Sequence, residues 1–267
     1  MIYSINDIAF ADLGLIPGQQ SDSNIAVSGN FDLPARIGKT HHVWEEGIEP
    51  YVSDGEIFFS GTDIRVHCLL QAADLHTAWA DVKAAINGSG GLMPLATPYG
   101  TYQVYAQGQS SMTIIDDHFA TVSLVFRKPL HQIDALALTP TVASDWMIDG
   151  LDYSVFNCFV LDHEPQVIRP AQIDFQSTVY GREAYKVNRP GIGTIELPLL
   201  MHTAIADFRA NIDKLQYALM RPGIRKLTMD GKLYDVFCKD GFRVTDLWEQ
   251  GSEMMGKVTI PFTYIVE

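Results

Sequence analysis

The sequence predicts an α+β fold of two similar tandem domains, each an antiparallel β-sandwich or sheet with one flanking helix. Three observations predict it: an order of elements that occurs twice at a period of about 135 residues, one amphipathic helix in each copy, and a hairpin plus an alternating strand after each helix. The length of 267 residues fits one large or two ordinary domains. We expect the first domain at residues 1–132, a linker at 133–145 and the second domain at 146–267.

The first matched segment is a strand-like run in each copy. Residues 34–44 (PARIGKTHHVW) align without a gap to residues 170–180 (PAQIDFQSTVY), with four identities in eleven columns. Four identities can arise by chance, but the elements that follow come in the same order in both copies. A second strand-like run, at residues 62–70 and 193–201, leads into the helix in each copy. A repeat of this length indicates a duplicated domain.

Each predicted helix has four apolar residues at the spacing i, i+4, i+7 and i+11. They are Leu75, Trp79, Val82 and Ile86 in the first copy and Phe208, Ile212, Leu215 and Leu219 in the second. Such a stripe on a 3.6-residue period predicts a helix that packs one face against a sheet. Both helices end at breakers, NGSGG at residues 87–91 and RPG at residues 221–223.

A hairpin and a closing strand follow each helix. In the second copy Asp230-Gly231 separates two alternating strands, which is the strongest short-range hairpin signal. The first copy is expected to turn at residues 98–100. Alternating apolar residues at 120–126 and 258–264 predict the closing strands. Pro261 lacks a ladder donor, so we expect the last strand at a sheet edge or a bulge.

Charge and cysteine content limit the classes of function. The chain has 19 Lys and Arg against 32 Asp and Glu, for a net charge of −13, and residues 1–140 account for −9 of it. This charge disfavours a protein that grips nucleic acid through phosphates. No apolar run approaches the roughly 18 residues of a membrane span, and we expect no export signal. Cys68, Cys158 and Cys238 are widely spaced and are predicted to be reduced core thiols.

The motifs that could carry chemistry are better explained by structure. His41 and His42 are neighbours on a predicted strand and would point to opposite faces, which disfavours a shared metal ion. The acidic clusters at residues 116–118 and 162–164 lie where turns are expected. The chain contains no GxSxG, GxGxxG, GxxxxGK[ST] or HExxH motif. We therefore predict no catalytic residue, metal or cofactor, and a protein that is not an enzyme.

The strand–helix–hairpin–strand order, with GTDIRVHCLL before the first helix and SLVFRKP at the first close, resembles the tail-tube superfamily of long-tailed bacteriophages. That superfamily includes tube, distal tail and baseplate hub proteins, and the resemblance covers nearly the whole chain. It implies a tail-tube-like fold and six-fold rings around a channel, so that a two-domain chain would close as a pseudo-six-fold homotrimer, with a hexamer as the alternative. The repeated second half departs from the commonest distal tail pattern and favours a tube or hub protein.

The same resemblance implies where the protein acts and with what. We expect a structural protein of the virion tail, assembled in the cytoplasm of the bacterial host, that contacts tube, tape-measure, hub or fibre proteins and no membrane. DNA would pass through the channel only as cargo and would not be bound specifically. A channel of this kind should repel phosphate, so we expect the acidic residues to line it. The polar loop at residues 18–23 is expected to make axial contacts.

The best candidate for an oligomer interface is residues 41–61, which we call the arm. It alternates acidic residues with large apolar ones, and aromatic residues are enriched at interfaces. The candidate interface residues are Trp44, Glu45, Glu46, Ile48, Tyr51, Phe58 and Phe59. The alternative interpretation of the arm is an ordinary long hairpin that packs on its own domain.

Two other functions remain open. One is a two-domain module that binds a ligand or a protein in the cleft between the copies, without catalysis. The other is a hydrolase whose site is divided between the domains and has no recognisable motif. Self-association distinguishes the tail protein from the binding module, since a stable monomer at high concentration would favour the latter.

Overall fold

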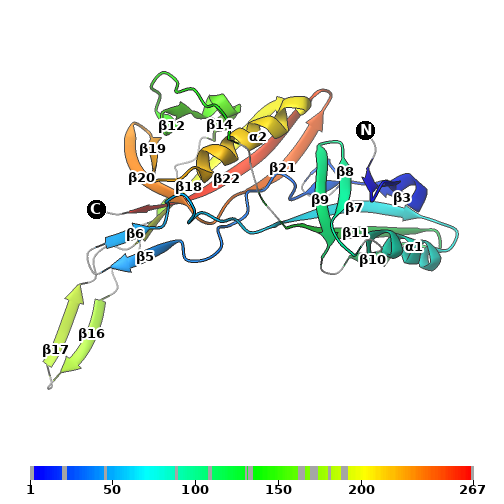
Figure 1. The fold of residues 1–267 in the computed structure, drawn as a ribbon, viewed down its shortest axis with the longest axis horizontal. Coiled ribbons are helices and arrows are strands. Elements are labelled where there is room, and N and C mark those ends of the chain that lie inside the picture. Colours follow the sequence, from blue (N-terminus) through cyan, green and yellow to red (C-terminus); the bar gives the residue numbers. More distant parts are fainter. Residues whose placement is uncertain are drawn as a thin grey trace.

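A computed structural model shows two curled antiparallel sheets, each with one helix beside it (Figure 1). The predicted fold class, two similar tandem units that each combine an antiparallel sheet with one flanking helix, is confirmed, and the chain is mostly β. The structure describes residues 3–19, 23–44, 47–87, 90–107, 110–129, 131, 135–161, 166–168, 174–179, 182–187 and 192–265.

Two half-barrels make up these residues. The first half-barrel comprises β1 (Ser4–Ile5), β2 (Ile8–Ala9), η1 (Phe10–Leu13), β3 (Leu15–Pro17), β4 (Val27–Ser28), β7 (Thr62–Gln71), α1 (Leu75–Asn87), β8 (Met93–Thr97), β9 (Gly100–Ala106), β10 (Ser111–Ile114) and β11 (Phe119–Lys128). The second comprises β12 (Trp146–Ile148), β13 (Leu151–Asp152), η2 (Tyr153–Phe156), β14 (Cys158–Val160), β15 (Gln166–Ile168), β18 (Ile192–Ala204), α2 (Ile205–Met220), β19 (Arg225–Met229), β20 (Lys232–Cys238), β21 (Arg243–Gln250) and β22 (Glu253–Ile265).

The two half-barrels have the same topology. The first sheet runs β2-β1-β8-β9-β11-β7-β3, with β4 beside β7 and β10 beside β11. The second runs β13-β12-β19-β20-β22-β18-β14, with β15 beside β18 and β21 beside β22. Each strand of the first sheet therefore has a counterpart at the same place in the chain order and in the sheet order of the second. Two similar half-barrels of this kind are consistent with a domain duplication.

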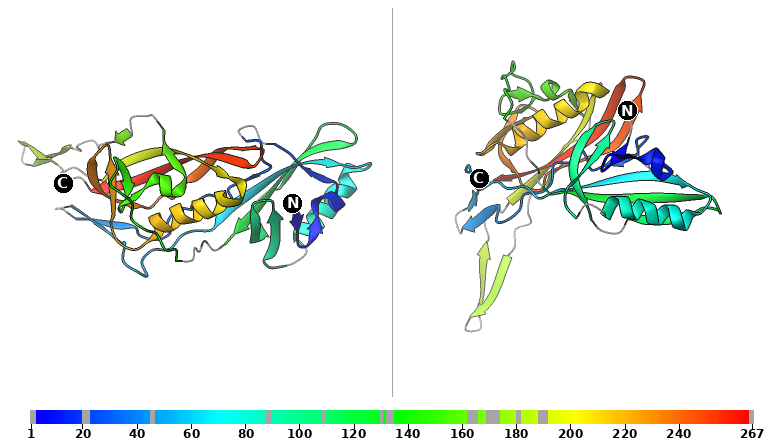
Figure 2. Two further views of the ribbon diagram at one scale, coloured as in Figure 1. Left: turned by 90° about the horizontal axis from the view of Figure 1, so that it is seen from above. Right: turned by 45° about the vertical axis from the view of Figure 1, so that its right-hand side comes forward.

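A separate two-stranded hairpin interrupts each half-barrel at the same point. It is formed by β5 (His41–Trp44) and β6 (Gly47–Pro50) in the first copy, and by β16 (Asp174–Val179) and β17 (Arg182–Val187) in the second. The three views in Figures 1 and 2 place both hairpins at the same end of the molecule, next to the second half-barrel. The first hairpin belongs to the arm and so crosses over from its own half-barrel.

The core of each half-barrel lies between its sheet and its helix. Alternate residues of the long strands are buried, and the intervening residues lie on the opposite, open face. The predicted helix stripes are confirmed: the four residues of the second helix are fully or nearly fully buried, and in the first helix Leu75, Val82 and Ile86 are buried while Trp79 is partly buried. In the three ribbon views α1 and α2 each follow one face of their own sheet (Figures 1 and 2).

The predicted turns have the expected chemistry. Asp230 and Gly231 have φ values of 50° and 70°, the left-handed pair that a tight hairpin requires. The first copy turns between Thr97 and Gly100, as predicted. In the turn at residues 116–118 the Asp116 carboxylate accepts hydrogen bonds from two backbone N–H groups at 2.8 Å. The acidic cluster at 162–164 lies outside the described residues.

The prediction for Pro261 is wrong. Strand β22 is internal, because it pairs with β18 along its length and with β20 and β21 on its other side. The pairing with β21 ends at Thr259 and the pairing with β20 begins at Phe262. Pro261 therefore falls at the junction between two partner strands, where a missing N–H leaves no ladder bond unmade.

The three cysteines are free and buried, as predicted. Burial raises the pKa of each thiol to about 12, so these side chains stay neutral and serve as small apolar core residues. Neither α1 nor α2, nor any other helix among the described residues, is long and apolar enough to cross a membrane.

Candidate functional site

The densest set of contacts between the half-barrels lies along residues 23–36, which we call the strap. The strap belongs to the first half-barrel, and it crosses the outer edge of β21 in the second. We call the whole contact region the seam. Its hydrogen bonds join residues that are about 100 to 225 positions apart in the sequence.

At one end of the strap, the side chain of Asn24 imitates a neighbouring strand. Its Nδ2 donates to the backbone O of Glu249, and its Oδ1 accepts from the backbone N–H of Glu249, both at 2.7 Å. The backbone N–H of Asn24 also donates to the carbonyl of Leu247 at 3.1 Å. An unpaired strand edge invites pairing with another chain, and these contacts close this part of the edge.

At the other end, backbone pairing joins the strap to the start of β21. Leu33 and Phe242 exchange both of their backbone hydrogen bonds, at 3.0 and 2.9 Å. The carboxylate of Asp32 accepts from the N–H of Val244 at 2.9 Å. Close approach of the two backbones requires a glycine next to this bridge: a Cβ at Gly241 would lie 2.0 Å from the carbonyl oxygen of Leu33.

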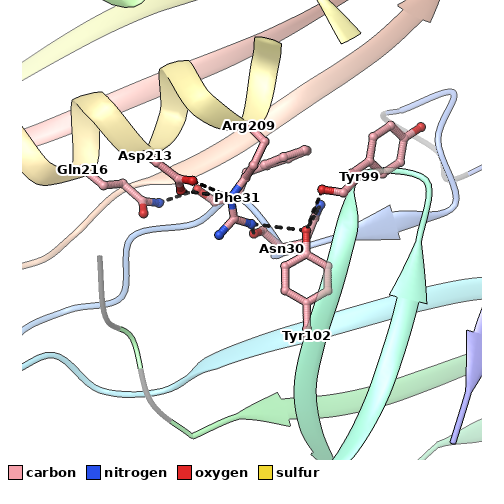
Figure 3. A network of polar contacts seen from close by, with 7 residues as sticks. All are labelled: Asn30, Phe31, Tyr99, Tyr102, Arg209, Asp213 and Gln216. Atoms are coloured by element: carbon pink, nitrogen blue, oxygen red, sulfur yellow. Dashed lines mark hydrogen bonds and ion pairs between the residues drawn. The ribbon is translucent and has the colours of Figure 1, made fainter. Parts of the chain in front are cut away.

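A polar network anchors the middle of the strap to α2 (Figure 3). Arg209 donates through Nε to Asp213 at 2.9 Å, and through Nη1 to the backbone O of Asn30 and the hydroxyl of Tyr102, both at 3.2 Å. Gln216, further along α2, donates to the backbone O of Phe31 at 2.8 Å. The helix of the second half-barrel thus holds both the strap and the β8–β9 hairpin of the first.

The apolar centre of the seam is Phe31, which is 1% exposed. Its ring meets the ring of Phe208 on α2 edge-on, with centroids 5.0 Å apart. The ring of Tyr99, in the β8–β9 turn, also lies against Phe31 with centroids 5.9 Å apart, and the hydroxyl of Tyr99 donates to Glu249 at 2.6 Å. Edge-to-face aromatic pairs of this kind add to the stability gained by burial.

The second part of the seam is formed by the arm. Gly223, just after α2, donates to the backbone O of Val52 at 2.6 Å. Buried Arg36 holds the arm in place, because its guanidinium donates to the backbone oxygens of Tyr51 and Glu56. The hollow at the end of α2 is lined on one side by Val52, Ile57 and Phe59 of the arm, and on the other by Leu219, Phe237 and Cys238 of the second half-barrel. The arm leaves only about 10 Å³ of it free.

The structure places the predicted interface residues in different surroundings. Phe59 is partly buried against the core, and Tyr51 lies under the ammonium of Lys39 at 5.5 Å. Phe58 faces solvent, with 57% of its surface exposed. Glu45 and Glu46 lie outside the described residues; Trp44 and Ile48 are placed on the first hairpin by their backbones. Part of the arm therefore packs on the second half-barrel, and an oligomeric role for the remainder stays a prediction.

The open faces of the two sheets meet at a groove of about 710 Å³ beside the strap. Asp63 and Arg65 of β7 line it from the first half-barrel, and Arg243 of β21 and Thr259 of β22 line it from the second. Charged side chains alternate with the buried positions of β7, β11, β18 and β22. They are Asp63, Arg65, Arg127, Glu196, Glu253 and Lys257. These three carboxylates and three cations balance on the four strands.

Asp32 makes the stability of the folded protein depend on pH. Burial raises the pKa of Asp32 to about 6, against the opposing effects of the Val244 N–H and Arg243. Because this folded-state value lies above the ordinary value of 3.8, the folded protein binds the proton more tightly than the unfolded chain. The resulting stabilisation is complete below about pH 4 and is lost as the pH rises through 6.

We expect Asp32→Asn to remove this dependence, since the amide oxygen still accepts from Val244 and does not ionise. Between pH 5 and pH 8 the natural chain should lose about 1 kcal/mol of unfolding free energy relative to the variant. Denaturant unfolding of both proteins at the two pH values measures the difference. Equal pH slopes for the two proteins would contradict the assignment.

The strap residues were not recognised in the sequence. Asn24, Asp32 and Arg209 are single polar residues without a motif, and their partners lie in the other half of the chain. One available signal was length, since 26 positions separate Ile8 from Pro34 but 19 separate Leu151 from Pro170. The longer segment of the first copy supplies the strap.

Among the described residues, no group of three or more His, Cys, Asp or Glu side chains is arranged to hold a metal ion. The seam consists of hydrogen bonds, aromatic contacts and strand pairing, which are suited to holding two similar units together. Comparison of the sequence with protein-family models and with curated proteins found no match in either.

Proposed function

We propose that this protein is a structural component of a phage or prophage tail, of the distal tail, tube or baseplate hub class, and that it assembles into a pseudo-six-fold ring. One observation carries the proposal: the chain contains two half-barrels of identical strand order. Three such chains provide six equivalent units. The ring would have tube, tape-measure, hub or fibre proteins as axial partners.

The chemistry of the seam supports a ring. The strap and arm of the first half-barrel contact β21 and the end of α2 in the second, so the two units use different surfaces. A contact between unlike surfaces of like units is heterologous, and its repetition gives a closed ring or an open filament. If neighbouring chains use the same kind of contact as the two half-barrels within a chain, each added chain presents a free surface for the next one.

The groove suggests which surface would face a channel. The open faces of both sheets line it together. If the two faces continue one another around a ring, they would form its inner wall. With three carboxylates and three cations on its long strands, such a wall would be close to neutral, and not acidic as the net charge of −13 led us to expect. Arg127 is already paired with Asp63 at 2.6 Å. A wall without surplus cations would let DNA pass as cargo, and the excess negative charge of the chain would lie mainly away from the long strands.

The groove also favours a second candidate, a two-domain module that binds a ligand or protein without catalysis. A groove of about 710 Å³ between two domains is of the size of small-molecule sites. Its lining includes carboxylates and guanidinium groups from both half-barrels.

Light scattering coupled to size-exclusion chromatography, followed by negative-stain electron microscopy, tests the proposal. We expect a particle of three chains, or six, whose class averages show a central hole. A chain that remains monomeric at high concentration would overturn the ring and favour the binding module.

A further inference from the structure

The seam covers two surfaces of the second half-barrel whose counterparts on the first half-barrel are left open by the residues that the structure describes. The first surface is the outer edge of β21, which the strap covers. The second is the hollow at the end of α2, which the arm fills. Because the two sheets have the same strand order, each surface has a definite counterpart on the first half-barrel.

The counterpart of β21 is β10, since each pairs with the last strand of its own sheet. On the side of β10 away from β11, the described residues provide no pairing strand. Two large apolar residues at its end are exposed: Ile114 at 51% and Ile115 at 60%. An uncovered edge with exposed isoleucines is a site for strand pairing with another chain.

The counterpart of the hollow at the end of α2 lies at the end of α1. Tyr105 corresponds to Phe237, because each comes directly before a residue that pairs with the closing strand at matching positions. Ala106 pairs with Phe126 of β11, and Cys238 pairs with Phe262 of β22. Ile86 corresponds to Leu219 in the helix stripes. In the first half-barrel this hollow has a volume of about 490 Å³, against the 10 Å³ that remain beside α2.

Exposure shows the same contrast. Tyr105 is 38% exposed, whereas Phe237 is 2% exposed beneath the arm. Leu92, which also lines the open hollow, is 51% exposed. The two surfaces thus differ mainly in the neighbour that covers one of them.

We propose that the outer edge of β10 and the hollow at the end of α1 form one docking surface for the second half-barrel of another copy of this chain. The occupant is a second copy because the corresponding surface within the chain accepts a half-barrel of the same topology. Within the chain, one neighbouring half-barrel covers both surfaces, so one docking half-barrel could cover both of their counterparts. This inference rests on the proposed function and names the surface through which its chains would meet.

The first test compares self-association of Tyr105→Asp and Ile114→Asp with that of the natural chain. Each variant places a charge at an already exposed position, so folding, followed by circular dichroism, should be retained. We expect each variant to weaken self-association at least tenfold in light scattering. The matched control is Val142→Asp, at an 89% exposed apolar position outside the docking surface, and it should assemble normally.

The second test keeps the surface intact. Replacing Tyr105 with photoreactive benzoylphenylalanine, in a mixture of isotope-labelled and unlabelled chains, should give crosslinks between chains that map to residues of the second half-barrel. Crosslinks to the first half-barrel, or within one chain, would overturn the docking surface.

The outcomes separate this inference from the proposed function. A ring that persists in Tyr105→Asp and Ile114→Asp overturns the docking surface and leaves the ring standing. Filaments or dimers that crosslink from position 105 to the second half-barrel support the docking surface and overturn the ring. A chain that is monomeric at every concentration overturns both.

Discussion

Replacing Gly241 with alanine is expected to open the seam, whereas replacing Gly251 with alanine is expected to leave it closed. Both glycines have left-handed backbones, with φ of +67° and +65°, so both substitutions carry a similar conformational cost of about 1 kcal/mol. They differ in surroundings. At Gly241 the new Cβ would lie 2.0 Å from the carbonyl oxygen of Leu33, while at Gly251 nothing lies within 4 Å.

The clash is with backbone, which cannot rotate away as a flexible side chain can. To relieve it, the strap must move off β21 and give up the paired hydrogen bonds between Leu33 and Phe242. With about 1 kcal/mol for each hydrogen bond and the loss of nearby packing, Gly241→Ala should lose about 2–3 kcal/mol more unfolding free energy than Gly251→Ala. Denaturant unfolding measures the difference, and hydrogen exchange of the Leu33 and Phe242 amides locates it. Equal losses for the two variants would show that the strap does not depend on this contact.

The parts of the fold that the sequence predicts are those that local patterns determine. The helix stripes, the Asp230-Gly231 turn and the alternating closing strands all depend on residues within about a dozen positions of one another. The duplication adds a second, weaker signal, because each copy supports the interpretation of the other. The structure has the same strand order in both halves, and that agreement depends on no single segment.

The seam is harder to predict from the sequence, because it joins segments that carry no shared pattern. Asn24 and Glu249 become neighbours only after both half-barrels have formed, and nothing local to either residue marks the pairing. The strap also lies in a segment where the two copies differ in length, so the repeat gives no information about it. The arm was recognised as a candidate interface from its aromatics, but its contact with the end of α2 depends on how the half-barrels are placed. Pro261 was misassigned for a related reason: its environment is set by two separate partner strands.

The strap makes the two halves unequal among the residues that the structure describes. A duplicated unit whose copies remained identical would have the same free surfaces on both, and nothing would determine which pairs form within a chain. The first copy has seven more positions between Ile8 and Pro34 than the second has between Leu151 and Pro170, and the strap lies largely in this longer segment. A contact within one chain also has a higher effective concentration than the same contact between chains.

Truncation of Phe31 to alanine is expected to separate the two half-barrels while both remain folded. The side chain is fully enclosed between Phe208 and Tyr99, one ring on each side of the seam. Removing a buried phenylalanine ring costs about 3–5 kcal/mol. Because the ring belongs to the strap and packs on α2, the loss falls on the contact between the half-barrels rather than on either core.

The matched control for Phe31→Ala is Phe126→Ala, which removes the same side chain from a 0% exposed position within β11. Hydrogen exchange distinguishes the two variants. In Phe31→Ala the N–H groups of Val244 and Glu249, which are bound by Asp32 and Asn24, should lose protection while the amides shared by β18 and β22 keep it. In Phe126→Ala the loss should begin in the pairing of β7 with β11. If Phe31→Ala left Val244 and Glu249 protected, the strap would be held by its backbone pairing and by Arg209 and Gln216, and the aromatic contact would be secondary.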